Sequence, residues 1–202
     1  MVPKVSTRQD TKEELLKAGT EIMMIKGYTN TGIAEVLKCV GVPKGSFYYY
    51  FDSKEDFALE IITRFDEIYR SEVLCVLRDT SLSPIARLKK YCKNTKEKLK
   101  DCECSTGCLI GNLSQEMSAQ SEVLREKLRQ VMANWRDVFA ACIEEGQVSN
   151  QITKDFEAQE LAEFFLSSWE GSIMRAKTTK NLKPIETFQD TMFDGILRPK
   201  DS

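Results

Sequence analysis

Residues 27–57, GYTNTGIAEVLKCVGVPKGSFYYYFDSKEDF, decide the fold of this chain. Gly27 precedes and Gly41 follows a short segment whose apolar residues recur at helical spacing, and glycine suits a tight turn at each end. Pro43 fits the first turn of a further short helix, and Ser53 fits the start of a longer one. The predicted order is therefore helix, tight turn, short helix, turn and long helix, which is the order of a helix-turn-helix unit.

The second short helix carries side chains that suit contact with DNA. Lys44 can neutralise a phosphate or meet a guanine, and Gly45 lets the backbone come close. The tyrosines at 48–50 offer hydroxyl groups to phosphates and aromatic faces to sugars or thymine methyl groups. Lys54 lies in the first turn of the following helix, where a cation opposes the helix dipole, so phosphate contact explains it better than helix stability. An exposed aromatic turn on a small helical core fits the spacing equally well.

Helical periodicity extends over nearly the whole chain, and no strand-type alternation stands out. We therefore expect an all-α protein with about nine helices. Later helices are expected at about 84–101, 109–117, 155–178 and 184–197, with a long helix between the second and third of these that Gly146 closes.

The composition limits the possible functions. At 202 residues, 42% hydrophobic and 30% charged, the chain is an ordinary globular protein of one or two domains, and its net charge of −2 excludes a uniformly basic surface. The absence of histidine excludes His-dependent triads and His-ligated metals. No glycine-rich phosphate loop or convergent carboxylate motif favours an enzyme. The longest uncharged stretch, residues 105–115, cannot span a bilayer and no signal peptide is recognised, so we expect a cytoplasmic protein without membrane contact.

Taken together, the motif residues resemble the TetR family of bacterial transcriptional regulators. The matching positions are Gly27-Tyr28, Thr31, Ile33, Val36, Gly41-Val42, Lys44-Gly45, Phe47-Tyr48, Phe51 and Lys54. The resemblance implies an N-terminal three-helix DNA-binding domain over residues 8–68 and a larger helical effector-binding and dimerisation domain over 69–202. Two positions depart from the family pattern: Pro43 stands where a capping serine is usual, and Tyr50 where histidine is common.

The resemblance also implies partners and contact residues. Carried over position by position, the DNA contacts of the family fall on Thr31, Lys44, Gly45, Ser46, Tyr48, Tyr49 and Lys54; Thr31 also fits the cap of the second helix. The implied assembly is a homodimer through helices eight and nine that binds a palindromic operator in double-stranded DNA. Repression is usual in the family. The alternatives are a helical adaptor or an enzyme without DNA binding.

The seven cysteines are an odd number, which favours reduced thiols over a disulfide framework. Gly107-Cys108-Leu109 resembles an element at the start of helix six in a subgroup of these regulators, some of which respond to reactive electrophiles. The dipole at a helix N-terminus favours the thiolate form of a cysteine such as Cys108. Lys177 could add cationic stabilisation, and Cys102 and Cys104 could act as resolving partners or as bystanders.

Other interpretations of the sensor region stay open. Cys108 also fits a buried, inert small side chain. A metal site is less expected because the spacing C-x-C-x3-C lacks a fourth ligand, so we expect neither a metal nor a cofactor. A noncovalent effector would use an apolar pocket among helices five to eight, where such residues are also typical of plain core. The candidate lining residues are Trp135, Phe139, Trp169 and Met174.

Overall fold

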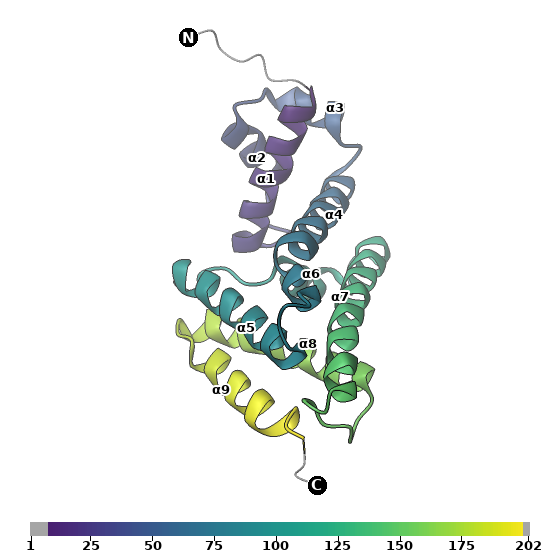
Figure 1. The fold of residues 1–202 in the computed structure, drawn as a ribbon. Coiled ribbons are helices and arrows are strands. Elements are labelled where there is room, and N and C mark those ends of the chain that lie inside the picture. Colours follow the sequence, from purple (N-terminus) through teal and green to yellow (C-terminus); the bar gives the residue numbers. More distant parts are fainter. Residues whose placement is uncertain (1–7, 200–202) are drawn as a thin grey trace, which may run out of the picture. The chain divides into compact units, whose positions relative to one another are not determined.

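A computed structural model describes residues 8–199, which form an all-α fold of nine α-helices (Figure 1), as the sequence predicts. The helices are α1 (Arg8–Lys26), α2 (Ile33–Val40), α3 (Phe47–Tyr50), α4 (Lys54–Glu72), α5 (Pro84–Asp101), α6 (Leu109–Met117), α7 (Glu122–Val148), α8 (Ala158–Thr179) and α9 (Lys183–Thr191). Short 3-10 segments occupy Lys44–Ser46 and Leu74–Arg78, and a π-helical turn, Met192–Ile196, extends α9. None of the helices in this range is long and apolar enough to cross a membrane.

The chain divides into two compact units. The first contains the described residues up to Asp66 together with Leu109–Arg129, and the second contains Glu67–Cys108 and the described residues from Gln130 onward. The chain therefore leaves the second unit at Cys108 and enters the first at Leu109, the first residue of α6. The predicted domains at 8–68 and 69–202 stay a prediction: in the compact units the first break follows Asp66, and α6 and the start of α7 group with the N-terminal helices.

Three phenylalanines form the centre of the first unit. Phe47, Phe51 and Phe57 are buried, and their ring centroids lie 4.7–5.4 Å apart. Full burial of each ring contributes about 1.5–3 kcal/mol. Gly19 of α1 allows this packing, because a Cβ atom at that position would lie 2.3 Å from Cζ of Phe57. The buried side chains of Phe47 and Phe51 thus anchor the segment 44–50 to the core of the first unit.

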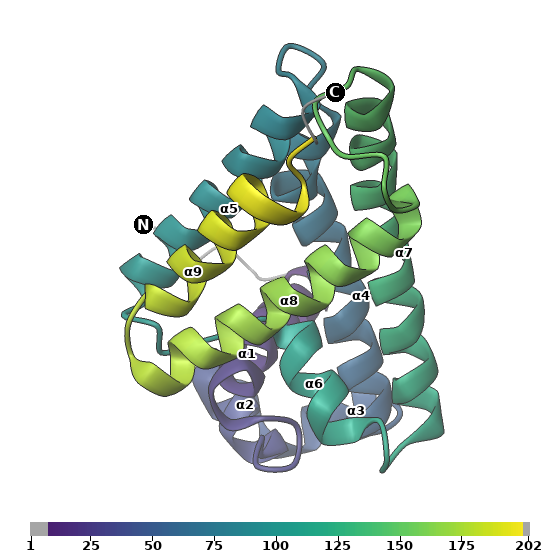
Figure 2. The same ribbon diagram turned by 90° about the horizontal axis from the view of Figure 1, so that it is seen from below.

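Aromatic side chains also fill the second unit. Tyr91 of α5 contacts Phe139 of α7 edge to face, with centroids 4.9 Å apart, and Phe139 lies 5.0 Å from Phe165 of α8. Trp169 of α8 continues the cluster toward Phe188 of α9, with centroids 5.0 Å apart. The α8 and α9 helices lie side by side, and α5 lies along α9 (Figure 2).

Two expectations about glycine and threonine are wrong for local reasons. Gly146 does not close α7, which continues to Val148; the glycine is needed because a Cβ there would lie 2.5 Å from Cδ1 of Ile152. Thr31 does not cap α2, whose N-cap is Gly32; its hydroxyl instead donates to the Gly27 carbonyl at 2.6 Å. Gly41, by contrast, closes α2 in the left-handed conformation, with φ of 75°, as predicted.

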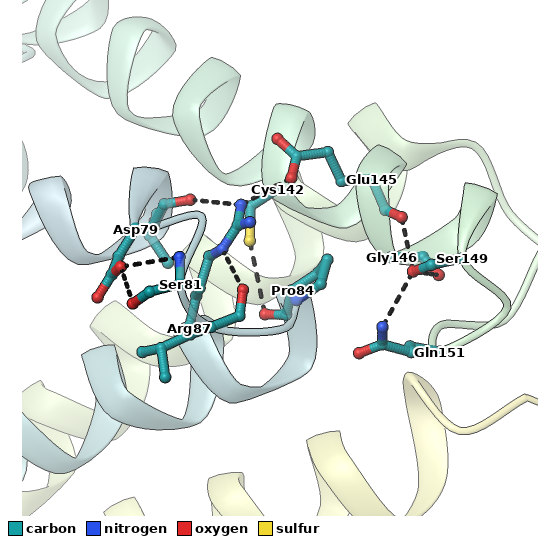
Figure 3. A network of polar contacts seen from close by, with 11 residues as sticks. Asp79, Ser81, Pro84, Arg87, Cys142, Glu145, Gly146, Ser149 and Gln151 are labelled. Carbon is teal, nitrogen blue, oxygen red and sulfur yellow. Dashed lines mark hydrogen bonds and ion pairs between the residues drawn. The ribbon is translucent and has the colours of Figure 1, made fainter.

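A buried arginine joins α5 to α7 and to the loop before α5 (Figure 3). Arg87 is 4% exposed; its Nε donates to the Leu82 carbonyl at 2.9 Å, and its Nη1 lies 2.7 Å from Oε2 of Glu145. Cys142 lies in the same network, with its Sγ 3.6 Å from the Pro84 carbonyl oxygen, and burial raises the pKa of its thiol to about 11. This network links α5 to α7 within the second unit, and the raised pKa leaves Cys142 unreactive at neutral pH.

Candidate nucleic-acid interface and effector centre

The turn after α2 sets the direction of the segment 44–50. The N–H groups of Gly41 and Val42 return to the carbonyls of Lys38 and Leu37 at 3.3 and 3.0 Å, which satisfies the end of α2. Pro43 then starts the 3-10 turn, and Ser46 N–H donates to its carbonyl at 2.9 Å. We call residues 44–50 the reading head.

Two tyrosines of the reading head are exposed. Tyr48 and Tyr49 are 70% and 60% exposed, while Phe47 between Ser46 and Tyr48 is fully buried. Lys44 is also exposed. Large aromatic side chains in water next to a cation are typical of a binding surface. The predicted contact residues Lys44, Tyr48 and Tyr49 are therefore all accessible to a partner.

Gly45 is exposed, and no described residue lies within 4 Å of a Cβ atom built on it. Packing among residues 8–199 therefore gives no reason for glycine at this position. Its predicted role, close approach of the backbone to DNA, stays a prediction, as does the predicted contact of the half-buried Ser46.

Arg8 adds a cation to the reading head that the sequence pattern does not reveal. Its guanidinium stacks over the Tyr49 ring at 4.2 Å from the centroid, and its Nη2 donates to the Tyr49 carbonyl at 3.2 Å. Because 41 residues separate the two, only the fold brings them together. The exposed guanidinium is suited to a phosphate.

Two other predicted contact residues have structural roles. Lys54 Nζ donates to the Thr29 carbonyl at 3.1 Å and lies 4.6 Å from the centroid of the Tyr28 ring. Burial lowers the pKa of the Lys54 ammonium, although the Glu116 charge opposes this. Thr31 is buried and bonded to Gly27, so its hydroxyl is already engaged. DNA contacts by Lys54 and Thr31 stay predictions.

Glu116, near the end of α6, binds the turn between α1 and α2. Its two carboxylate oxygens accept the N–H groups of Tyr28 and Thr29, each at 2.8 Å. Burial alone would raise the pKa of the Glu116 carboxyl, but the hydrogen bonds from Thr29 and Tyr28 and the charge of Lys54 outweigh it and lower the pKa. Gly27 makes room for this contact, because a Cβ there would lie 2.4 Å from the Glu116 carboxylate. Sequence reasoning missed Glu116, which follows Tyr28 by 88 residues.

The predicted sensor Cys108 belongs to a polar cluster in the second unit, in which Tyr91 is buried and the other members are half-buried. Its thiol is hydrogen-bonded to the Glu170 carboxyl of α8. Tyr69 of α4 and Tyr91 of α5 lie near enough to interact electrostatically with both groups, and the two hydroxyl oxygens are 2.6 Å apart. We call Tyr69, Tyr91, Cys108 and Glu170 the effector centre. Sequence reasoning missed three of its four members.

Burial governs the ionisation of this centre. It raises the pKa of the Glu170 carboxyl to about 7, against the lowering effect of the hydrogen bond from Cys108. Burial also raises the pKa of Tyr69 and of Tyr91 well above the ordinary value. Lys177 lies about two turns beyond Glu170 on α8. Its predicted contact with Cys108 stays a prediction.

Three of the four predicted pocket residues surround the effector centre. Trp135 stacks on Tyr69, with ring centroids 4.2 Å apart. Phe139 contacts the Tyr91 ring edge to face, and the ring centroids of Trp169 and Tyr91 lie 5.8 Å apart. All three are fully buried. Met174 differs, since it is exposed and lines a groove between α8 and α9. Trp169 Nε1 is buried and has no hydrogen-bond partner among the described residues.

The other two predicted cysteines differ from each other. Burial alone would raise the pKa of the half-buried Cys102 thiol, but hydrogen bonds from Thr106 and Ser105 outweigh it and lower the pKa. Cys104 is buried, and burial raises the pKa of its thiol. Between residues 8 and 199, no group of three or more His, Cys, Asp or Glu side chains is arranged to hold a metal ion. Cys102 is therefore the more nucleophilic of the two.

Known proteins share both parts of this chain. Residues 15–61 match the family described as bacterial regulatory proteins, tetR family, and residues 84–192 match the tetracyclin repressor-like C-terminal domain. The HTH-type transcriptional repressor DhaR of Mycobacterium sp. (strain GP1) is 34% identical over 94% of each chain. The transcriptional regulator AcuR of Cereibacter sphaeroides is 37% identical over 89% of this chain and 82% of its own.

A solved structure gives the same result. The reduced form of Escherichia coli NemR superposes with a TM-score of 0.84 at 28% identity, covering 95% of this chain and all of that one. The family resemblance and the predicted fold class are thereby confirmed.

Proposed function

The chain belongs to the TetR family of bacterial regulatory proteins, and we propose that it is a homodimeric repressor that leaves its operator when a small effector reaches Cys108. The relatives DhaR and AcuR are named as a transcriptional repressor and a transcriptional regulator. We propose the same non-enzymatic role here, in the cytoplasm, where the chromosomal operator lies.

The exposed aromatic surface of the reading head carries the DNA-binding part of this proposal. Tyr48 and Tyr49 are exposed, Arg8 stacks on Tyr49 and Lys44 of the same segment is exposed, while the buried Phe47 anchors the segment. A helical adaptor that had lost DNA contact would have no reason to keep this arrangement. Tyrosine hydroxyls and guanidinium groups both bind phosphates, which position a recognition segment on the duplex.

The test is the salt dependence of operator binding. A duplex selected from random sequence by the wild-type protein serves as the operator, and fluorescence anisotropy gives the affinity at several salt concentrations. Lys44→Ala should weaken binding and reduce the slope of log K against log salt by about 1, because one phosphate contact is lost. Lys93→Ala, which removes an exposed lysine of the second unit, is the matched control. Equal slopes for both variants would remove Lys44 from the interface.

The connection between Cys108 and the first unit supports release by the effector. Cys108 directly precedes α6, and Glu116 of α6 holds the turn that begins the helix-turn-helix. A group added to Cys108 would therefore displace α6 through the chain, and α6 would carry the displacement to this turn. If Cys108→Ser protein left the operator as readily as the wild type after treatment with a quinone or maleimide, covalent sensing at Cys108 would be wrong.

A noncovalent effector is the second candidate, supported by Trp169 Nε1, which lies beside the aromatic cluster and has no hydrogen-bond partner in the part of the chain that the structure describes. An effector that held the protein off its operator without changing the protein's mass would favour this candidate.

Exposed apolar side chains on the C-terminal helices support dimerisation. Phe156 precedes α8, and Phe164 and Met174 lie on it, all substantially exposed. Phe164 contributes to two neighbouring surface grooves, one of which runs along α8 and α9. Phe164→Glu should therefore give a monomer by light scattering, while a Phe164→Glu dimer of normal mass would exclude this interface.

A further inference from the structure

A groove of the second unit shares no lining residue with the effector centre or with the grooves of α8 and α9. One wall is a face of α7, whose lining residues include Asn134, Val138, Ala141 and Glu145 at steps of four, three and four. The other wall is the end of α4 and the 3-10 segment Leu74–Arg78. We call it the α7 groove. Its volume of about 320 Å³ is enough for a small molecule, since such sites span about 300–1,000 Å³.

The buried Arg87 joins the two walls of the α7 groove (Figure 3). Its Nη1 donates to the Leu77 carbonyl of one wall at 3.4 Å, and the same atom lies 2.7 Å from Oε2 of Glu145 on the other wall. Cys142 lines the groove between them, and because burial raises the pKa of its thiol, it adds an uncharged surface. The walls are thus held in place before a ligand arrives, which lowers the entropic cost of binding.

Arg78 supplies a cation to this groove. It is exposed, and its side chain forms no ion pair or hydrogen bond with another described residue. The two carboxylates that line the groove already have partners: Glu145 pairs with Arg87 at 2.7 Å, and Asp137 pairs with Arg136 at 2.9 Å. An anion beside Arg78 would therefore meet a guanidinium that no carboxylate of the described chain neutralises.

The rest of the lining suits a hydrocarbon chain. Leu77, Val138 and Ala141 supply aliphatic side chains, and Ala141 is exposed and small. A guanidinium binds a carboxylate through two parallel hydrogen bonds. A small polar anion such as phosphate would leave the aliphatic surface in water, whereas an aliphatic acid would cover it.

We propose that the α7 groove binds a small aliphatic carboxylate, with its carboxylate group on Arg78 and its hydrocarbon chain on Leu77, Val138 and Ala141. This inference goes beyond the proposed function, because the binding requires neither the operator nor a reaction at Cys108.

The test uses sodium hexanoate as the probe and hexanamide as its uncharged counterpart, with the full-length protein carrying 13C-labelled methyl groups. The methyl signals of Leu77, Val138 and Ala141 should shift and saturate with hexanoate, with a Kd on the order of 1 mM for a ligand of so few atoms. Hexanamide should bind at least about 10-fold more weakly, because hydrogen bonds between charged groups are the stronger ones.

Three substitutions separate the contributions to binding. Arg78→Gln should weaken hexanoate binding about 10-fold or more and leave hexanamide binding unchanged. Ala141→Leu should weaken the binding of both compounds, because the larger side chain occupies the place of their hydrocarbon chain. Lys98→Gln is the matched control, since it removes one exposed cation of α5 in the same unit and should leave the affinity for hexanoate unchanged.

Several results would overturn the inference. They are a titration without saturation at the three methyl groups, equal affinities for hexanoate and hexanamide, and equal weakening by Arg78→Gln and Lys98→Gln. Cys108→Ser should bind hexanoate like the wild type; a loss of binding in this variant would place the carboxylate at the effector centre instead. Because the titration contains no DNA, its result is independent of whether the protein binds an operator.

Discussion

Replacing Glu116 by alanine should free the turn between α1 and α2. In the wild type, the carboxylate accepts the N–H groups of Tyr28 and Thr29 at 2.8 Å, and Lys54 adds a favourable charge. Hydrogen bonds to a charged group contribute about 1.5–3 kcal/mol each. Because Glu116 is only partly buried, solvent screening reduces this, and we expect about 2 kcal/mol for the two bonds together.

Amide hydrogen exchange measures this loss at the two groups concerned. A loss of about 2 kcal/mol in local opening free energy corresponds to roughly 30-fold faster exchange at Tyr28 and Thr29. Glu122→Ala is the matched control, since Glu122 pairs with Arg125 on its own helix and is fully solvated. Unchanged exchange at Tyr28 and Thr29 in Glu116→Ala, or equal acceleration in both variants, would refute the proposed role of Glu116.

The same contact predicts a dependence on pH. The pKa of the Glu116 carboxyl is lower in the folded chain than its ordinary value, so its stabilisation is complete above the unfolded pKa of about 4.3 and is lost as the pH falls through the folded value. Glu116→Gln should therefore remove part of the acid sensitivity of exchange at Tyr28 while keeping the side-chain volume. It should also weaken release of the operator by an effector, because α6 then holds the turn less firmly.

Three further results are expected. Gly45→Ala should leave the free energy of unfolding within about 0.5 kcal/mol of the wild type, because the added Cβ has no neighbour within 4 Å among the described residues, while weakening operator binding at least 10-fold; unchanged binding would exclude close backbone approach at Gly45. Arg87→Met should cost about 2–4 kcal/mol in urea unfolding, because the buried carbonyl of Leu77 and the half-buried carbonyl of Leu82 lose their donor, whereas Glu145→Gln should cost less than about 1 kcal/mol because its side chain is 54% exposed. Iodoacetamide at pH 7.5 should label Cys102 faster than Cys92 or Cys142, since the pKa is lowered for the first thiol and raised for the others; mass spectrometry of the peptides gives the order, and equal rates would contradict it.

Local turn chemistry explains which parts of the fold were predictable. Gly41 in the left-handed conformation and Pro43 at the start of the next turn act within a few residues, so the helix-turn-helix was predicted from sequence alone. The predicted helix end at Gly146 was wrong, because the sequence does not distinguish a glycine that ends a helix from a glycine that makes room for a neighbouring side chain. Its need arises from Ile152, which folds back over it.

The composition of the effector centre was harder to predict from the sequence. Cys108 was found by its Gly-Cys-Leu element, but its acidic partner Glu170 comes from α8 and its tyrosine neighbours from α4 and α5. A glutamate among helical residues normally indicates a solvated surface, so no pattern distinguished Glu170. Only the packing of several helices removes its carboxyl from water and thereby changes its chemistry.

The passage of the chain between its two units also bears on how such regulators are recombined. Because Leu109–Arg129 belongs with the N-terminal helices, a fragment that stops near residue 68 lacks α6 and the carboxylate that binds its first turn. A chimaera that joins a foreign sensor domain at that point would therefore contain an incomplete first unit. A chimaera with an exchanged sensor domain needs junctions near residues 66, 108 and 129. With these junctions, α6 stays with the DNA-binding helices, and the cysteine before it stays with the sensor domain.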